Sequence, residues 1–268
     1  MVLTAPAPVP AVGSPPPDAT GGAGHWLHAY RRMVVWDVVD LRLQLPLLAS
    51  VLVLQGAGFA LGIGLFFHHI PTRVAMFVVT GVPVVNLVTA GLIFEPQVVA
   101  DQRTQGSYEF LQAMPVPRSA TAAAWYTVSL VTALPAVVLS LVVGAARYHL
   151  TMAVTPAIVP AVLATSVAGT LIGYAIAHGV TAPMATRLVS VSFIFMIFGF
   201  CPVMFPAGQL PHWLVEVNRF LPFGSMATIV RAALVKGAAT GVGSAYLVVT
   251  SWAAVSGLVA AWAVGRRS

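Results

Sequence analysis

The sequence predicts an all-α membrane protein with six transmembrane helices, and three observations support this fold class. Of the 268 residues, 59% are hydrophobic and only 7% are charged, so the apolar content is too continuous for a soluble core. Six apolar blocks are each about 20 residues long, the length at which an α-helix crosses a bilayer. Most of the charges gather in the segments between these blocks, where water or a partner protein can reach them.

The N-terminal residues precede the first apolar block and divide into two parts. Residues 1–24 are rich in Pro, Ala and Gly and cannot bury enough surface to fold, so we expect a disordered cytoplasmic tail. No basic stretch precedes an apolar run there, and a secretory signal is therefore not expected. Residues 26–45 mix Trp and Arg with apolar side chains, which predicts an amphipathic helix lying in the inner membrane interface.

Residues 25–268 form the predicted transmembrane domain, and the six apolar blocks place its spans. They cover approximately residues 47–67, 74–94, 119–144, 154–177, 188–203 and 245–264. A short hairpin at 68–73 joins the first two spans, and a short link at 179–187 joins the fourth span to the fifth. Because the number of spans is even, both termini lie on the same side of the membrane.

The basic residues predict which side is cytoplasmic, because Lys and Arg concentrate in cytoplasmic loops. The side that holds the termini has eight of them: Arg31, Arg32, Arg42, Arg103, Arg118, Arg187, Arg266 and Arg267. The other side has five: Arg73, Arg147, Arg219, Arg231 and Lys236. We therefore expect a protein of the cell membrane with both termini, and the segment 95–118, in the cytoplasm.

The segment 95–118 lies between the second and third spans and reads EPQVVADQRTQGSYEFLQAMPVPR. Its charged side chains are Glu95, Asp101, Arg103, Glu109 and Arg118. Burying an unpaired charge is costly, so we expect this segment in water or against a partner protein.

Within this segment, Gly106 and Ser107 predict a corner between two short helices. Gly106 takes the left-handed conformation that ends the first helix, and Ser107 caps the second. Glu109 lies in the first turn of the second helix, where the helix dipole favours a negative charge, and Pro115 ends that helix. The second helix would present apolar side chains to a groove on a partner: Tyr108, Leu111 and Met114.

Prolines divide residues 201–222 into pieces too short to cross a membrane. These pieces belong to a region that extends from residue 201 to residue 236. Leu210, Trp213 and Leu214 share one face of a short helix at the outer interface, which predicts a buried apolar plug. A further helix is expected to end near Lys236. The alternative for the first of these helices is a position on the surface without a gating role.

Two stretches of the sequence resemble the ABC-2 type permeases, the membrane subunits of ATP-driven ABC exporters. Glu95 followed by GSYEFLQAMPVPR (106–118) is similar to the cytoplasmic segment of that family. CPVMFPAGQLPHWL (201–214) and LPFGSMATIVR (221–231) are similar to its extracellular re-entrant region. The resemblance implies a dimer of this chain with a second copy or a paralogue. It also implies a separate cytosolic ABC ATPase and a hydrophobic drug, antibiotic or lipid-like cargo.

The resemblance further implies roles for individual residues. A cytoplasmic coupling helix would meet the ATPase through Glu95, Asp101, Arg103, Gly106, Ser107, Glu109 and Pro115. The outer gate, built of re-entrant half-helices, would include Pro206, Leu210, Trp213 and Leu214.

The uncharged polar and aromatic residues of the spans suggest a substrate pathway. Buried amides need partners, and Phe and Met adapt to irregular apolar shapes. The candidates are Gln55, Phe59, Asn86, Phe195 and Met196. Hydrogen bonding between helices and ordinary core packing are the competing roles for these side chains. Small residues four apart, such as Gly58 with Gly62 and Gly169 with Gly173, favour close packing within the chain, with a dimer seam as the alternative.

The sequence lacks the groups that would energise transport within this chain. No G-x-x-x-x-G-K-[ST] motif occurs, so ATP and Mg²⁺ are expected on the partner ATPase and no cofactor on this subunit. No charged residue lies near the middle of a predicted span, which disfavours the main alternative, an ion-coupled secondary carrier or channel. A membrane-embedded enzyme would need a cluster of catalytic groups that the sequence does not show.

Two further classes are excluded by charge and cysteine content. The chain carries a formal charge of +6, but its Arg residues are scattered and form no basic stripe for nucleic acid. The single cysteine, Cys201, excludes an intrachain disulfide and a metal site of several cysteines.

Overall fold

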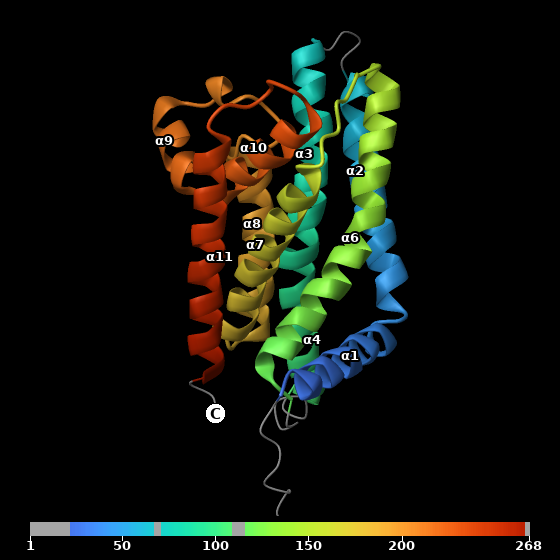
Figure 1. The fold of residues 1–268 in the computed structure, drawn as a ribbon, viewed down its shortest axis with the longest axis vertical. Helices are drawn as coiled ribbons and strands as arrows, with labels where there is room; N and C mark the ends of the chain where they lie inside the picture. Colours follow the sequence, from blue (N-terminus) through green and yellow to red (C-terminus); the bar gives the residue numbers. More distant parts are fainter. Residues whose placement is uncertain (1–21, 67–70, 109–115, 266–268) are drawn as a thin grey trace, which may run out of the picture.

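The computed structural model describes residues 22–66, 71–108 and 116–265, and every regular element in these ranges is a helix (Figure 1). In chain order they are α1 (Ala23–Asp40), α2 (Gln44–Phe66), α3 (Thr72–Val88), the π-helical turn η1 (Thr89–Phe94), α4 (Glu95–Gln105), α6 (Arg118–Tyr148), α7 (Ile158–Gly179), α8 (Pro183–Phe200), the 3-10 turn η2 (Ala207–Gln209), α9 (His212–Phe220), α10 (Pro222–Leu234) and α11 (Val242–Gly265). The prediction of an all-α fold is thus confirmed for the described residues.

Five helical stretches are long and apolar enough to cross a membrane: Thr72–Gln105, Arg118–Tyr148, Ile158–Gly179, Pro183–Phe200 and Val242–Ala263. They coincide with the second to sixth predicted spans. The first predicted span falls on α2, whose shorter apolar part is Gln44–Phe59. The structure therefore supports a membrane protein, whereas a sixth crossing by α2 stays a prediction.

The long helices run along the length of the molecule, and the short ones gather at its two ends (Figure 1). The helix α1 lies across one end, where it packs against α6 and its Asp40 side chain accepts a hydrogen bond from Gln102 of α4. The helices α9 and α10 lie at the opposite end. The predicted interfacial helix and the predicted re-entrant region are therefore separated by the length of the bundle.

The stretch formed by α3, η1 and α4 is the centre of the bundle. Of the 18 most apolar consecutive residues in this stretch, 89% are buried inside the chain. The corresponding share is 17% for α8 and for α11. Val84, Val88 and Leu92 belong to a core cluster that also contains Phe223 and Met226 of α10. The outer helices surround this stretch and leave much of their own apolar surface exposed.

Small residues let α7 and η1 come into backbone contact. A Cβ atom added to Gly173 would lie 2.1 Å from the carbonyl oxygen of Gly91, and one added to Gly91 would lie 2.6 Å from the Thr170 nitrogen. By contrast, added Cβ atoms at Gly58 and Gly62 of α2 would meet no atom within 4 Å. The small residues of the fourth predicted span therefore pack within the chain. By contrast, Gly58 and Gly62 of the first predicted span face open space.

Several helices have bounds that differ from those of the predicted segments. The interfacial helix predicted over 26–45 ends at Asp40, and a turn leads into α2 at Gln44. The helix that contains the second predicted span continues beyond residue 94, without a break, through η1 and α4 to Gln105. The fifth helix begins earlier than predicted, at Pro183, where the proline suits a first helical turn. Residues 1–21 of the predicted tail lie outside the described residues.

Candidate functional site

The helix α4 ends at Gly106, which has a φ of +76° and a ψ of 0°. This left-handed conformation is the one predicted for a residue that stops the helix, and the backbone N–H of Gly106 donates to the carbonyl oxygen of Arg103. Thr104, Gln105 and Gly106 are exposed. The end of α4 therefore forms an accessible corner, which we call the Gly106 corner (residues 104–106).

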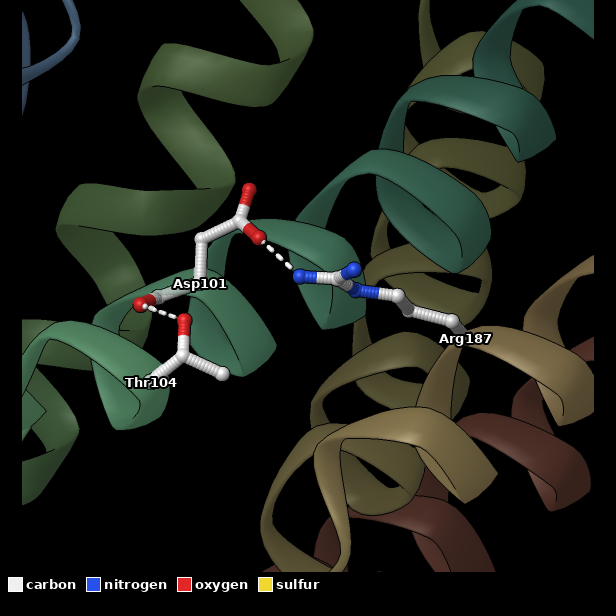
Figure 2. Close-up of polar contacts among 3 residues, drawn as sticks. All are labelled: Asp101, Thr104 and Arg187. Carbon is white, nitrogen blue, oxygen red and sulfur yellow. Dashed lines mark hydrogen bonds and ion pairs between the residues drawn. The ribbon is translucent and has the colours of Figure 1, made fainter.

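The charges beside the Gly106 corner are held by the chain itself. Asp101 forms an ion pair with Arg187 of α8, and the Thr104 hydroxyl donates to the backbone carbonyl of Asp101 at 2.8 Å (Figure 2). Arg103 donates to the carbonyl oxygens of Val180 and Thr181 in the link between α7 and α8. Because Asp101 and Arg187 are nearly half exposed, their pairing contributes little to stability and mainly fixes position.

Tyr108 packs against its own chain, which corrects the prediction that it fills a groove on a partner. Its ring is 8% exposed and clusters with Val99 and Ala177. The Arg103 guanidinium lies 4.5 Å from the ring centroid and donates to the Tyr108 hydroxyl at 3.3 Å. Burying this apolar ring against the end of α7 is more favourable in free energy than leaving it exposed to water.

The remaining residues of the predicted coupling helix are described only in part. The Ser107 hydroxyl donates to the carbonyl oxygen of Gln102 at 3.3 Å, so it helps to close the end of α4. The other residues predicted for the helix that Ser107 would cap lie outside the described residues: Glu109, Leu111, Met114 and Pro115.

Glu95 is buried, which shows that the prediction of water or a partner around it is wrong. The side chain is 1% exposed, and neither carboxylate oxygen has a hydrogen-bond partner in the described part of the chain. It borders a cavity of about 30 Å³ together with Phe94 and Trp125. The cause is the central position of this stretch, because the buried residues of α4 that follow Glu95 cover most faces of the helix: Pro96, Val98, Val99 and Ala100.

Asp37 of α1 approaches Glu95 closely enough for the two carboxyl groups to interact electrostatically. Asp37 is only 3% exposed. Burial, with a smaller contribution from the charge of Asp40, raises the pKa of Asp37 from 3.8 to about 7. The contact between α1 and the central stretch thus contains an acid that ionises near neutral pH.

We expect this acid to make the stability of the protein depend on pH. The folded state binds the Asp37 proton more tightly than the unfolded chain does. The contribution of Asp37 to the free energy of unfolding should therefore fall as pH rises from about 4 to 7 and level off above the folded pKa of about 7. The pKa difference corresponds to on the order of 4 kcal/mol. Asp37→Asn should flatten this slope in thermal unfolding between pH 5 and 8, whereas Asp40→Asn, at an exposed position, should largely retain it. An unchanged slope in Asp37→Asn would contradict this assignment.

At the other end of the molecule, α9 is anchored by Asn218. Its amide nitrogen donates to the carbonyl oxygens of Phe200 at 2.7 Å and Leu214 at 2.9 Å. Of the four predicted gate residues, Leu214 is buried, and Pro206 and Leu210 are half-buried. Trp213 is 64% exposed, so the prediction that it belongs to a buried plug is wrong.

The orientation of α9 explains this result. Trp213, Val217 and Phe220 follow one another at intervals of four and three residues, so they share one face of the helix, and all three are exposed. Leu214 and Asn218 occupy the neighbouring face and are buried. The amphipathic character of α9 was therefore predicted correctly, but the face turned toward the protein was not.

The candidate substrate-pathway residues differ in their surroundings. The Gln55 amide donates to the Thr89 hydroxyl at 3.4 Å, and Phe59 stacks on Phe198 with 4.9 Å between ring centroids. Asn86 is fully buried, and its amide atoms have no hydrogen-bond partner among the described residues. Met196 packs against the core, whereas Phe195 is 70% exposed and points away from it. Gln55 thus has the predicted alternative role of joining two helices.

Arg231 of α10 carries a buried charge. The sequence identified it only as one of the basic residues on the outer side. It is 4% exposed. Its Nε donates to the Thr80 hydroxyl at 3.0 Å, one Nη donates to the Val203 carbonyl at 2.8 Å, and the guanidinium lies 3.9 Å from the Phe77 ring centroid. The signal in the sequence is a single Arg within the apolar run MATIVRAALV (226–235).

Arg231 also borders a cavity with a volume of about 700 Å³. The outer cavity, as we call it, lies among α9, α10, the N-terminal part of α11 and the turn that precedes α11.

Neither of these sites has the donor set of a metal centre. Within the described ranges, no three His, Cys, Asp or Glu side chains gather in a way that could hold a metal ion. In comparisons with known proteins, no family model and no curated protein matched the sequence.

Proposed function

We propose that this protein is the permease subunit of an ATP-driven exporter of the ABC-2 type, located in the cell membrane with both termini in the cytoplasm. In this proposal a cytosolic ABC ATPase binds at the Gly106 corner and supplies the ATP and Mg²⁺. The cargo is a hydrophobic or amphipathic molecule that leaves past α9 and α10. The sequence resemblance described above and the positions of these elements at opposite ends of the bundle support the proposal.

The observation that carries the proposal is the continuous helical stretch Thr72–Gln105. It ends at the Gly106 corner, and near its other end Thr80 accepts a hydrogen bond from Arg231 of α10. A continuous, largely buried helical stretch of this kind can transmit a displacement from one end to the other. A push on the corner by the ATPase would therefore reach the re-entrant helices without passing through a flexible loop.

A second copy of the chain, or a paralogue, completes the proposed exporter. One face of α2 is apolar and exposed along its length: Leu47, Val51, Leu54, Gly58 and Leu61. These residues recur at intervals of three and four, and Gly58 allows a partner helix to approach closely. We propose this face of α2 as the dimer contact.

Purification of the complex tests the proposed function. When the chain is isolated in mild detergent from the cells that produce it, we expect an ATPase with a P-loop to copurify. ATP hydrolysis by the complex should rise when hydrophobic cargo is added. Transport by the purified chain alone in liposomes, driven by an ion gradient, would instead show a secondary carrier and overturn the proposal.

A further inference from the structure

We propose that the outer cavity is a binding site for the anionic headgroup of a single-chain amphiphile, with Arg231 as its anchor. The ligand class is a phosphate or carboxylate head on a hydrocarbon tail. This site does not depend on the proposed export function, because the same molecule could be cargo or a lipid of the membrane.

The first argument is the unbalanced charge of Arg231. A guanidinium stays protonated in proteins, and burying it without a counter-ion is costly. Among the described residues, no carboxylate lies within 4.0 Å of it. Its contacts with Thr80, Val203 and the Phe77 ring are to neutral groups, so they hold the guanidinium in place and leave its charge uncompensated. An anion in the cavity would supply the missing charge.

The second argument is the composition of the cavity around this charge. Gly224, Thr228 and Arg231 line the cavity and lie on one face of α10, at intervals of four and three residues. Gly224 belongs to the first turn of α10, where no side chain caps the helix and the positive end of the helix dipole also favours an anion. The two other charged residues that line the cavity, Glu216 and Arg219, are exposed and of opposite sign. The net charge of the cavity is therefore that of buried Arg231.

The third argument identifies an amphiphile rather than a free ion. A cavity of about 700 Å³ is far larger than a phosphate group, and apolar side chains such as Val215, Phe220 and Val248 form part of its wall. Phe220 is 73% exposed and continues into the apolar face of α9 with Trp213 and Val217. A tail that leaves the cavity beside Phe220 would thus lie on an apolar surface, while the head stays at Arg231.

The matched variants for a test are Thr228→Glu and Thr228→Gln. Residue 228 borders the cavity three positions before Arg231, so a glutamate there pairs with the guanidinium and replaces the ligand's charge. Glutamine has the same size as glutamate but no charge, so Thr228→Gln controls for the cavity volume that the larger side chain occupies. Arg231→Gln removes the anchor itself, but it also removes two hydrogen bonds and risks misfolding, so Thr228→Glu is the decisive variant.

The experiment measures binding of fluorescent lysophosphatidic acid to the purified full chain in nanodiscs of phosphatidylcholine, without ATP or any ATPase. Thr228→Glu should weaken binding about tenfold or more, the loss expected for one charge-assisted contact, and Thr228→Gln should change it by less than about threefold. Unlabelled lysophosphatidic acid should displace the probe, whereas monoacylglycerol of the same chain length should not.

Three outcomes would overturn the proposal. Equal binding by Thr228→Glu and Thr228→Gln, both folded as judged by thermal unfolding, would show that the charge of Arg231 does not hold the ligand. Displacement by monoacylglycerol as effective as that by lysophosphatidic acid would show an apolar site instead. Displacement by inorganic phosphate at the same concentration as lysophosphatidic acid would show that a free anion, not an amphiphile, is recognised.

Discussion

Gly173→Ala is expected to destabilise the protein by about 3 kcal/mol or more, at the upper end of the usual cost of overpacking. The new Cβ would lie 2.1 Å from the Gly91 oxygen, 2.9 Å from the Gly91 carbonyl carbon and 3.0 Å from the Leu92 Cα. All three atoms belong to the backbone of η1, so no change of rotamer can relieve the clash. The helix α7 would have to move away from the central stretch.

Gly169→Ala is the matched control, because it makes the same change one turn earlier in the same helix. Its Cβ would meet the Val88 Cα at 3.5 Å, an ordinary contact, and alanine favours the helical conformation over glycine. Thermal unfolding in detergent should therefore show a large decrease in Tm for Gly173→Ala and little change for Gly169→Ala. Equal effects of the two substitutions would mean that α7 and η1 are not in backbone contact.

The features that the sequence predicts well are those decided by local chemistry. Long apolar blocks form helices because no other structure satisfies the backbone in a membrane, and five of the predicted spans coincide with long apolar helices. Gly106 takes the left-handed conformation because only glycine does so without a steric cost. Gln55 hydrogen-bonds to a neighbouring helical element, the role expected of an amide among apolar side chains.

The predictions of burial were wrong where the packing of one helix against another decides whether a side chain is buried. Glu95 was assigned to water because it begins a charged segment, but it belongs to the central stretch, where neighbouring helices bury most faces of the helix. Tyr108 and Trp213 were placed on the wrong surface for a related reason, since the periodicity of a helix shows that it has an apolar face but not what covers that face. Arg231 was counted as an outer basic residue, but its burial was not predicted because its partners Thr80 and Val203 are distant in the sequence.

Gly106→Val is expected to reduce substrate-stimulated ATP hydrolysis by the assembled transporter about tenfold, with little effect on membrane insertion or Tm. A β-branched side chain at a φ of +76° costs on the order of 1–3 kcal/mol. An added Cβ meets nothing within 4 Å, so this cost comes from the backbone alone. The corner would relax to a different conformation and misplace the segment that follows. Because Gly106 lies beyond the end of α4, the spans themselves should be unaffected.

Graded substitutions separate backbone conformation from side-chain size at this position. Gly106→Asn should retain most of the activity, because asparagine tolerates the left-handed region, and Gly106→Ala should lie between Asn and Val. Gly208→Val is the matched control, since Gly208 is exposed at the opposite end of the molecule and has no positive φ. Glu109→Lys should lower ATPase binding by a separate route, through a charge that opposes the helix dipole. If Gly106→Val assembled with the ATPase and hydrolysed ATP like the parent protein, the energy would enter elsewhere and the proposed coupling site would be wrong.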